Sequence, residues 1–275
     1  MRRRFRLYQR QREGRLRLRL FGPHVAGALM RAGDFIYAID IEDQAVRPIA
    51  RAYEPPVGAE IARVAALIGP SDDVLVVGAH IGTVAIPVAR FCRALWAIEA
   101  NPRTFALLEL NLKLNDAKNV HAVNIVVSDN EEEVEFVLSR TNSGGSKRMP
   151  RLRRPIYFYD DPAIVRLKAR PLDELFPKPS FSLIFMDIEG SEYAALKGMQ
   201  RILGSARALL VEFLPHHLRD VSGVTPEEFT GAIEPHFGEL FVPSKNLRVQ
   251  QRAFQQTLRA MYDKNEGDAG LVFTR

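Results

Sequence analysis

From residue 71 onward the chain alternates short apolar runs with segments of helical spacing. Runs of this length that are rich in β-branched residues are typical of strands buried on both faces. We expect seven such strands, at 73–77, 94–99, 120–127, 181–187, 206–213, 240–242 and 271–273, and a short antiparallel addition at 134–138. Helices are expected over 83–90, 102–114 and 226–237, with another ending at Leu203. The alternation predicts an α/β fold: a Rossmann-like, seven-stranded, mostly parallel sheet with helices on both faces.

The first 70 residues follow a different pattern. Residues 15–20 alternate arginine with leucine, which predicts an edge strand, and residues 34–41 predict a second strand. Residues 57–69 have helical spacing. We therefore expect two parts: a basic N-terminal arm with a small cap of strands and a helix over 1–70, and the main domain over 71–275.

Charge is distributed unevenly along the chain. The net charge is +5, yet the first 20 residues carry nine arginines and one glutamate, so the remainder is mildly acidic. A basic arm indicates an anionic partner, such as nucleic acid, a lipid surface or an acidic substrate. A solubilising terminus is the alternative.

Composition narrows the class of protein. With 275 residues, 47% of them hydrophobic, the chain can bury a sizeable core, and its composition is not that of a disordered protein. No apolar run has the length of a transmembrane helix. Cys92 is the single cysteine, so no internal disulfide can form. This favours a reducing compartment, and we expect a cytoplasmic location.

Glycines or polar side chains follow four of the predicted strands. They are Gly78 and Gly82 after the first strand, Glu99 at the end of the second, Asp187 and Glu189 after the fourth, and Glu212 and His216 at the fifth. In an open α/β sheet, ligands bind outside the carboxyl ends of the strands. Because these residues converge at one edge of the predicted sheet, the sequence favours an enzyme.

The first two strand ends indicate an adenosine site. Gly78 and Gly82 allow backbone to approach a ligand closely, although their Gly-x-x-x-Gly spacing is not that of a dinucleotide site. Glu99 follows Gly78 by 21 residues, near the separation at which a βαβ unit presents an acid to a ribose. A carboxylate can accept hydrogen bonds from both ribose hydroxyls. A solvated acid at a strand end is the alternative.

A loop rich in small residues interrupts the alternation at 141–146, and it is followed by five basic residues within 147–154. A solvated basic loop is one interpretation of this segment. The other is a mobile lid that brings cationic groups over the crevice to hold a negatively charged substrate.

Several stretches match a known family in order and spacing. They are Val77-Gly78-Ala79-His80-Ile81-Gly82, Ile98-Glu99-Ala100-Asn101-Pro102, Asn111-Leu112-Lys113-Leu114-Asn115, Asn142-Ser143-Gly144-Gly145-Ser146 and Asp187-Ile188-Glu189-Gly190-Ser191-Glu192. Over about residues 50–215, beginning with Tyr53-Glu54-Pro55, the chain resembles the FkbM-type family of S-adenosylmethionine-dependent methyltransferases, which have the class I methyltransferase fold. The spacing between the glycine turn and the Asp-x-Glu-Gly-x-Glu stretch carries the resemblance.

The resemblance implies that the cofactor is S-adenosyl-L-methionine. It implies that the backbone of the glycine turn approaches the methionine part of the cofactor, that Glu99 holds the ribose hydroxyls, and that Val126 flanks the adenine. Asp187 and Glu189 would lie beside the transferred methyl group. The residues expected to bind the cofactor are Gly78, Ala79, His80, Gly82, Thr83, Glu99, Asn101, Val126 and Asp187.

Two positions depart from the family's pattern. Val76 stands where the family usually has an acid, two residues before the first glycine, and His80 stands where it usually has an asparagine. His80 is suited either to donate to the cofactor's carboxylate or to cap the following helix. These departures keep open the alternative of a cofactor-binding scaffold without turnover.

Methyl transfer from a sulfonium is an in-line displacement, so catalysis requires alignment of donor and acceptor and a base for the acceptor's proton. The candidate catalytic residues are Asp187, Glu189, Glu212 and His216, with Asp187 the first choice as the base and His216 the second. Their oxygen and imidazole groups also suit a divalent metal. Because no tight ligand-spacing motif accompanies them, we predict no metal site.

Three functions follow from these observations. The first is O-methylation of a hydroxyl on a small molecule, a sugar, or a glycan or lipid-linked acceptor, including an anionic one. The second is methylation of nucleic acid, such as RNA, held by the arginine-rich arm; it predicts binding that weakens steeply with salt. The third is the scaffold. No sequence feature identifies the acceptor or the oligomeric state.

Overall fold

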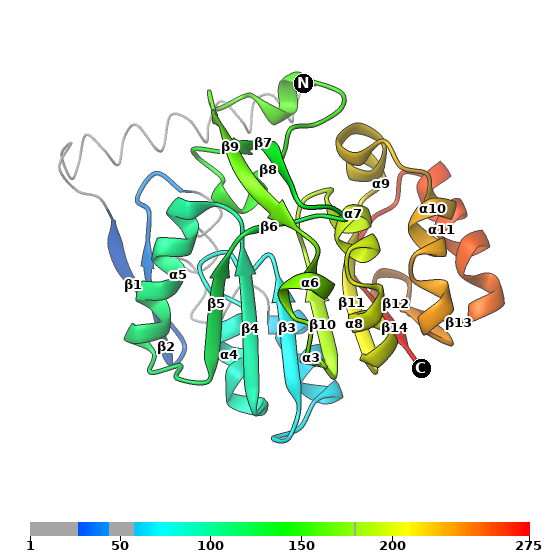
Figure 1. The fold of residues 1–275 in the computed structure, drawn as a ribbon, viewed down its shortest axis with the longest axis horizontal. Helices are drawn as coiled ribbons and strands as arrows, with labels where there is room; N and C mark the ends of the chain where they lie inside the picture. The colour runs from blue at the N-terminus through cyan, green and yellow to red at the C-terminus, as the bar shows by residue number, and fades with distance from the viewer. Residues whose placement is uncertain (1–26, 44–57, 179) are drawn as a thin grey trace.

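The computed structural model describes residues 27–43, 58–178 and 180–275. Its largest sheet has the strand order β13-β12-β14-β11-β10-β3-β4-β5 (Figure 1). The strands are β3 (Asp73–Val77), β4 (Ala94–Glu99), β5 (Val120–Asn124), β10 (Leu183–Met186), β11 (Ala208–Phe213), β12 (Glu239–Val242), β13 (Leu247–Gln250) and β14 (Asp268–Thr274). The first five pair in parallel, and β12, β13 and β14 pair antiparallel. The predicted α/β class and mostly parallel sheet are confirmed.

The sheet has eight strands rather than the predicted seven, and the additional strand is β13. Its sequence, Leu-Arg-Val-Gln, is short and half polar, so its periodicity does not predict a strand. β13 forms because the chain turns tightly after β12, with Asn246 in the left-handed region at a φ of 47°. Asparagine tolerates that conformation better than most residues. A turn, and not an apolar run, therefore creates this strand.

Helices cover both faces of the large sheet, which explains why its central strands are apolar throughout. Leu75 and Val77 of β3 lie in one core and Val74 and Val76 in the other. The first core contains side chains from α6 (Leu172–Leu175), α7 (Glu192–Lys197), α8 (Gln200–Ser205), α10 (Pro226–Gly231) and α11 (Phe254–Asp263). The second contains side chains from α3 (Gly58–Leu67), α4 (Ala85–Val88) and α5 (Pro102–Leu114).

Three of the predicted helices are shorter or interrupted in the structure. The helix predicted to end at Leu203 is two helices, α7 and α8, separated at Gly198. A Cβ at Gly198 would lie 2.0 Å from the carbonyl oxygen of Ser128, so a close backbone approach accompanies this break. The helix predicted over 83–90 is α4 followed by a short 3-10 turn, and the one predicted over 226–237 ends its α-helical part at Gly231.

A second sheet lies above the carboxyl ends of β4 and β5 (Figure 1). Its strands, in spatial order, are β6 (Val126–Val127), β9 (Ala163–Arg170), β7 (Glu132–Leu138) and β8 (Lys147–Arg148). The single strand predicted over 120–127 is wrong: β5 stays in the large sheet, whereas β6 pairs with β9. The chain leaves the large sheet after β5 because β6 pairs with β9, a strand that the sequence did not predict. The predicted addition at 134–138 is part of β7.

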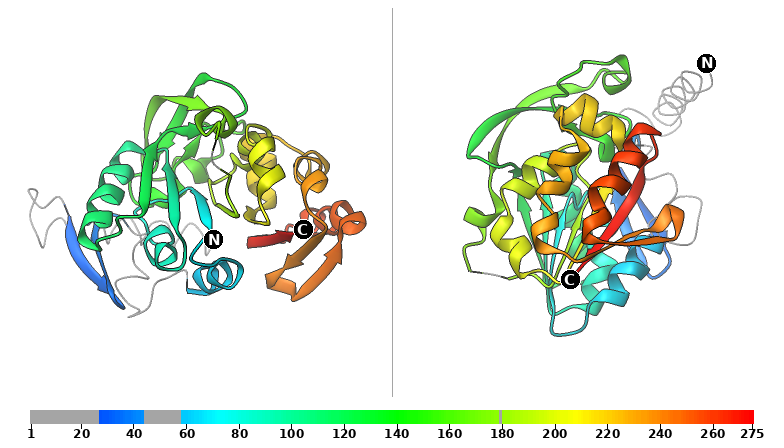
Figure 2. Two further views of the ribbon diagram at one scale, coloured as in Figure 1. Left: turned by 60° about the horizontal axis from the view of Figure 1, so that its bottom comes forward. Right: turned by 90° about the vertical axis from the view of Figure 1, so that its right-hand side faces the viewer.

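The predicted strand over 34–41 and helix over 57–69 correspond to β2 (Phe35–Ile39) and α3. β2 pairs antiparallel with β1 (Ala28–Ala32), and this hairpin, blue in Figure 2, lies at the opposite end of the molecule from the C-terminal elements. The arginine-rich arm with the strand expected at 15–20, and Tyr53-Glu54-Pro55, lie outside the described residues. The domain boundary at residue 70 stays a prediction.

Two asparagines attach the hairpin to α5. Asn111 and Asn115 are four residues apart, so they lie on one face of the helix. Asn111 Oδ1 accepts from the amide of Ala38 at 2.6 Å, and its Nδ2 donates to the carbonyl oxygens of Ala38 and Ile81 at 3.1 and 2.9 Å. Asn115 makes the same pair of contacts with the backbone of Ile36, at 2.9 and 2.6 Å. The asparagines thus satisfy an edge of β2 that pairs with no strand of the described residues.

Among the helices of residues 27–43, 58–178 and 180–275, none has both the length and the apolar character needed to cross a membrane.

Substitution Asn111→Ala tests the attachment. Asn111 is fully buried, and its loss would leave backbone groups of Ala38 and Ile81 without partners. We expect the free energy of unfolding, measured in urea, to fall by about 2–3 kcal/mol. Glu109→Ala, at an exposed position on the same helix, should change it by less than ~0.5 kcal/mol. Equal effects of the two substitutions would contradict the proposed attachment.

Candidate functional site

The turn after β3 brings three strand ends together. Gly78 has a φ of 89°, and a Cβ there would lie 1.8 Å from the carbonyl oxygen of Asp187. The amides of Gly78 and Ala79 both donate to the carbonyl oxygen of Ile98 at 2.9 Å. Only glycine allows β3 to approach β10 this closely without a steric clash. The carboxyl ends of β3, β4 and β10 therefore meet at one point.

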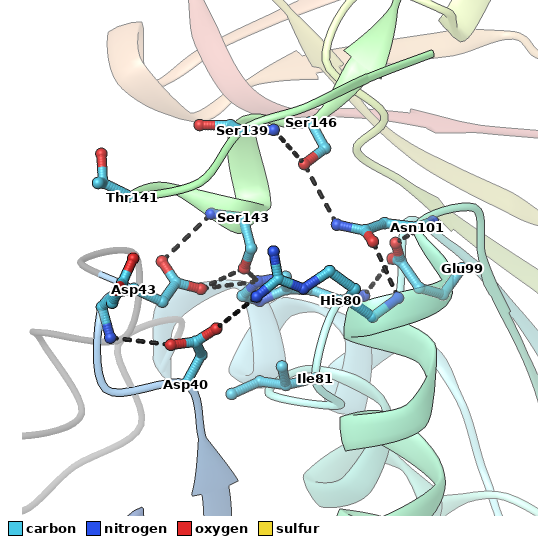
Figure 3. Close-up of polar contacts among 12 residues, drawn as sticks. Asp40, Asp43, His80, Ile81, Glu99, Asn101, Ser139, Thr141, Ser143 and Ser146 are labelled. Atoms are coloured by element: carbon cyan, nitrogen blue, oxygen red, sulfur yellow. Dashed lines mark hydrogen bonds and ion pairs between the residues drawn. The ribbon is translucent and has the colours of Figure 1, made fainter. Parts of the chain in front are cut away.

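Glu99, the last residue of β4, faces the glycine turn (Figure 3). Its carboxylate accepts from the backbone amides of His80 and Asn101, each at 2.8 Å. A carboxylate has about four acceptor positions, so two remain for ribose hydroxyls. Burial raises the pKa of Glu99 to about 7, against the lowering effect of these two amides. Asn101 also caps α5, because its side chain accepts from the amide of Arg103.

A pocket with about 540 Å³ of empty space, its mouth included, lies beside Glu99. Apolar side chains from the end of β4, from β6 and from β7 form part of its wall: Ile98, Ile125, Val126, Val127 and Phe136. Gly78, Glu99, Asp187 and Glu189 lie at the same pocket. It thus combines an apolar surface of the kind an adenine needs with an acid for a ribose.

Acidic side chains gather where β10 and β11 end. Lys147 Nζ lies 2.8 Å from Glu189 Oε2, and His217 Nε2 lies 3.3 Å from the same oxygen. His217 Nδ1 lies 3.3 Å from Glu212 Oε2. Lys147 and His217 are both buried. Glu212, His217, Glu189 and Lys147 therefore form a continuous chain of charged or titratable groups that reaches the pocket at Glu189.

The cluster shifts the pKa values of Asp187 and Glu189 in opposite directions. Burial and the nearby Glu212 raise the pKa of Asp187 well above its ordinary value. Burial would also raise that of Glu189, but Lys147 and His217 outweigh it and lower the pKa of Glu189. One carboxyl group of the pocket thus stays ionised beside a cation, while the other takes up a proton readily. Such a separation is typical of sites that carry out acid–base chemistry.

Two pocket residues have left-handed backbone. His80 has a φ of 52° and Glu189 a φ of 56°. The other non-glycine residues of the described chain with positive φ are asparagines and aspartates, which adopt this region more readily than glutamate. Backbone strain of this kind clusters at functional sites.

The structure places six of the predicted site residues at the pocket: Gly78, His80, Glu99, Val126, Asp187 and Glu189. The others lie behind it. Gly82 packs against α4 and α5, since a Cβ there would lie within 3.0 Å of Ile86 and Leu108. Ala79 and Asn101 are buried, and Thr83 is half-buried in the turn before α4 (Ala85–Val88). Glu212 contacts His217 in α9 (Pro215–His217). The ring centroid of His216 lies 4.3 Å from that of His217.

Four residues at or beside the pocket are not among the predicted site residues, although Lys147 belongs to the basic segment predicted as a solvated loop or a lid over the crevice. Ser143 and Ser146 lie at its rim and Lys147 and His217 behind Glu189. Ser143 and Ser146 belong to a stretch that matched the FkbM-type pattern, so a signal for them existed. Nothing in the local sequence distinguishes His217 from His216, because only the path of α9 decides which ring faces the acids.

Residues 147–154, predicted as a solvated basic loop or a mobile lid, are tied to acids and backbone. Besides Lys147, Arg148 pairs with Glu132, Arg153 with Glu135, and Arg154 with the buried Asp220. Arg151 donates to the carbonyl oxygen of Gly223. The segment leads from β8 in the second sheet to the turn after α9. Its cationic side chains bind acids and backbone along this path.

The mostly parallel sheet, with a glycine turn after β3 and an acid at the end of β4, has the architecture of the class I methyltransferase fold. The sequence matches the family model described as the methyltransferase FkbM domain over residues 77–240. The chain therefore belongs to this family, as its motifs predicted. Membership identifies S-adenosylmethionine as the cofactor. A comparison with curated proteins gave no match.

Several solved structures are similar. Methyltransferase FkbM from Methylobacillus flagellatus KT is 17% identical, with a TM-score of 0.45 over 83% of this chain and 54% of that one. The similarity thus spans about half the length of the Methylobacillus protein. Trm5b from Pyrococcus abyssi is 10% identical, with a TM-score of 0.44 over 92% of this chain and 57% of that one. The precorrin 8w decarboxylase of Methanobacterium thermoautotrophicum is 12% identical, with a TM-score of 0.43 over 79% and 90%.

The residues present fit S-adenosylmethionine. Gly78 lines the pocket with backbone alone, and Glu99 has acceptor positions to spare for a ribose. Among the described residues, no group of three or more histidine, cysteine, aspartate and glutamate side chains is arranged to hold a metal ion.

The raised pKa of Glu99 predicts a pH dependence of cofactor binding. Ribose hydroxyls donate to the ionised carboxylate, so affinity is full above the pKa of about 7 and is lost as the pH falls through it. We expect the affinity for S-adenosylhomocysteine, measured by calorimetry, to rise roughly tenfold from about pH 6 to about pH 8. Glu99→Gln should bind ~1.5–3 kcal/mol more weakly at the higher pH and show a flat profile.

Glu109→Gln, at an exposed position on α5, should retain the wild-type profile. Binding by the wild-type protein that is independent of pH would contradict the role of Glu99.

Proposed function

We propose that the protein transfers the methyl group of S-adenosylmethionine to a hydroxyl of a small molecule, a sugar, or a glycan or lipid-linked acceptor. The observation that carries this proposal is that Asp187 and Glu189 share a pocket with Gly78 and Glu99. The acids thus lie beside the place where the glycine turn and the ribose acid would hold the cofactor.

The cofactor supplies a methyl group on a sulfonium, which needs no further activation. The chain aligns the reactants and accepts the hydroxyl proton. Asp187 is the preferred base, because burial and Glu212 give it a proton affinity far higher than that of an exposed carboxylate. Glu189, held ionised by Lys147, is suited to accept a hydrogen bond from the acceptor and fix its orientation.

His217 supports this arrangement from behind. Its two ring nitrogens lie between Glu189 and Glu212, and burial lowers its pKa, so the ring is neutral at neutral pH. A neutral imidazole donates through one nitrogen and accepts through the other. Since Glu212 has a raised pKa, it can donate its proton to His217 while His217 donates to Glu189. His217 is thus suited to position a pocket carboxylate, and the nearby His216 also helps to lower the pKa of Glu189.

The arginines of residues 147–154 contact Glu132, Glu135, Asp220 and backbone, and the arginine-rich arm lies outside the described residues, so the pocket alone carries the proposal. Methyl transfer to RNA is therefore an outcome of the experiment below and not the proposal.

Asp187→Asn tests the base. The amide keeps the size of the side chain but cannot take a proton, so transfer should slow at least ~100-fold. Affinity for S-adenosylhomocysteine should change less than about threefold. Transfer is measured with tritiated methyl donor and either a small-molecule extract or total RNA of the source cells. In the wild-type protein the rate should rise with pH through the raised pKa of Asp187, and Asp187→Asn should lack this rise.

Glu109→Gln is the control and should behave as wild type. Label found only in RNA would contradict a small-molecule acceptor. Full activity of Asp187→Asn would exclude Asp187 as the base, and binding of S-adenosylhomocysteine without any transfer would favour the scaffold.

A further inference from the structure

β3 has no acid near the glycine turn. Val76, which stands where the family usually has a carboxylate, is fully buried, pairs with Phe185 and Ala97 in the neighbouring strands, and belongs to a hydrophobic core. By the resemblance to the FkbM-type pattern, a carboxylate at this position would help to hold the amino group of the cofactor's methionine part, and Val76 cannot take that role.

A carboxylate reaches the turn from another part of the chain. Asp43 follows β2, and only 3% of its side chain is exposed. Its carboxylate accepts from the amide of Ser143 at 3.2 Å and from the hydroxyl of the same residue. Asp43 Oδ2 also lies 3.9 Å from His80 Nε2. Figure 3 shows Asp43, Ser143 and His80 converging from three separate segments.

These contacts determine which nitrogen of His80 carries the proton. Ser143 has one hydroxyl proton, and it is directed to the Asp43 carboxylate, which can only accept. The Ser143 oxygen lies 2.6 Å from His80 Nε2, so in this contact it must accept. Nε2 of His80 therefore carries the proton, and Nδ1 keeps a lone pair. Burial lowers the pKa of His80, which keeps the ring neutral.

We propose that Asp43, acting through Ser143, is a positioning residue that makes His80 a hydrogen-bond acceptor for the ammonium group of the cofactor. His80 and Ser143 both line the pocket, and Asp43 adds a negative charge directly behind them. A histidine held in the opposite tautomer would present a donor, which repels an ammonium. This inference rests on S-adenosylmethionine as the cofactor and extends its site to the N-terminal hairpin.

The chain offers a matched control. Glu42, next to Asp43, pairs with Arg140 at 2.9 Å and so connects the same two segments, but among the described residues it contacts neither Ser143 nor His80. Its removal takes away a carboxylate from the same segment without touching the hydrogen bonds that set the tautomer of His80.

The experiment compares two ligands by calorimetry. S-adenosylhomocysteine carries the ammonium group, whereas 5′-methylthioadenosine has the same adenosine without the amino-acid part. We expect Asp43→Ala to weaken binding of the first about tenfold and of the second less than twofold. Glu42→Ala should change neither by more than about twofold. Ser143→Ala should behave as Asp43→Ala does, and Ser143→Thr, which keeps the hydroxyl, should restore the affinity.

A second measurement needs no ligand. Nitrogen-15 spectra of the histidine rings should place the proton of His80 on Nε2 in the wild-type protein and show a mixture of tautomers in Asp43→Ala and Ser143→Ala. Equal losses for both ligands in Asp43→Ala, or an unchanged tautomer, would overturn the proposal. Wild-type protein that binds neither ligand would overturn the cofactor assignment as well, whereas wild-type binding that Asp43→Ala leaves intact would overturn this proposal alone.

Discussion

The site depends on the contact between Gly78 and the backbone of Asp187. Any side chain at residue 78 would collide with the Asp187 carbonyl, which a Cβ would approach to 1.8 Å. β3 and β10 pair along their length, and this contact continues the close approach one residue beyond them, so the glycine turn and the acids that follow the two strands line one pocket. The position of Asp187 relative to the cofactor site is thus a backbone property.

The second constraint is electrostatic. Burying several carboxyl groups together is unfavourable unless they are paired or protonated. The protein does both: Lys147 and His217 hold Glu189 ionised, while Asp187 and Glu212 have raised pKa values. Lys147 comes from the small sheet and His217 from α9, so the charge balance of the pocket requires that these elements pack correctly over the large sheet.

The N-terminal hairpin of β1 and β2 is also connected to the site. Asn111 joins it to α5 and to the glycine turn through Ile81, and Asp43 joins its end to Ser143 and His80. A segment that lies before the methyltransferase sheet in the sequence is therefore connected to His80 and, through Asn111, to Ile81 in the turn that would hold the cofactor.

The sequence by itself determined the features that depend on near neighbours along the chain. The apolar runs identify the central strands, and Gly78, Glu99 and Asp187 are recognisable because they end such runs, where a parallel sheet places its ligands. Tertiary structure decided the rest: the change of sheet between β5 and β6, the contacts of His217 with Glu189 and Glu212, and the arrival of Lys147 and Asp43 at the site. The physical reason is distance along the chain. Asp43 and Ser143 are 100 residues apart, and no local periodicity encodes a hydrogen bond between them.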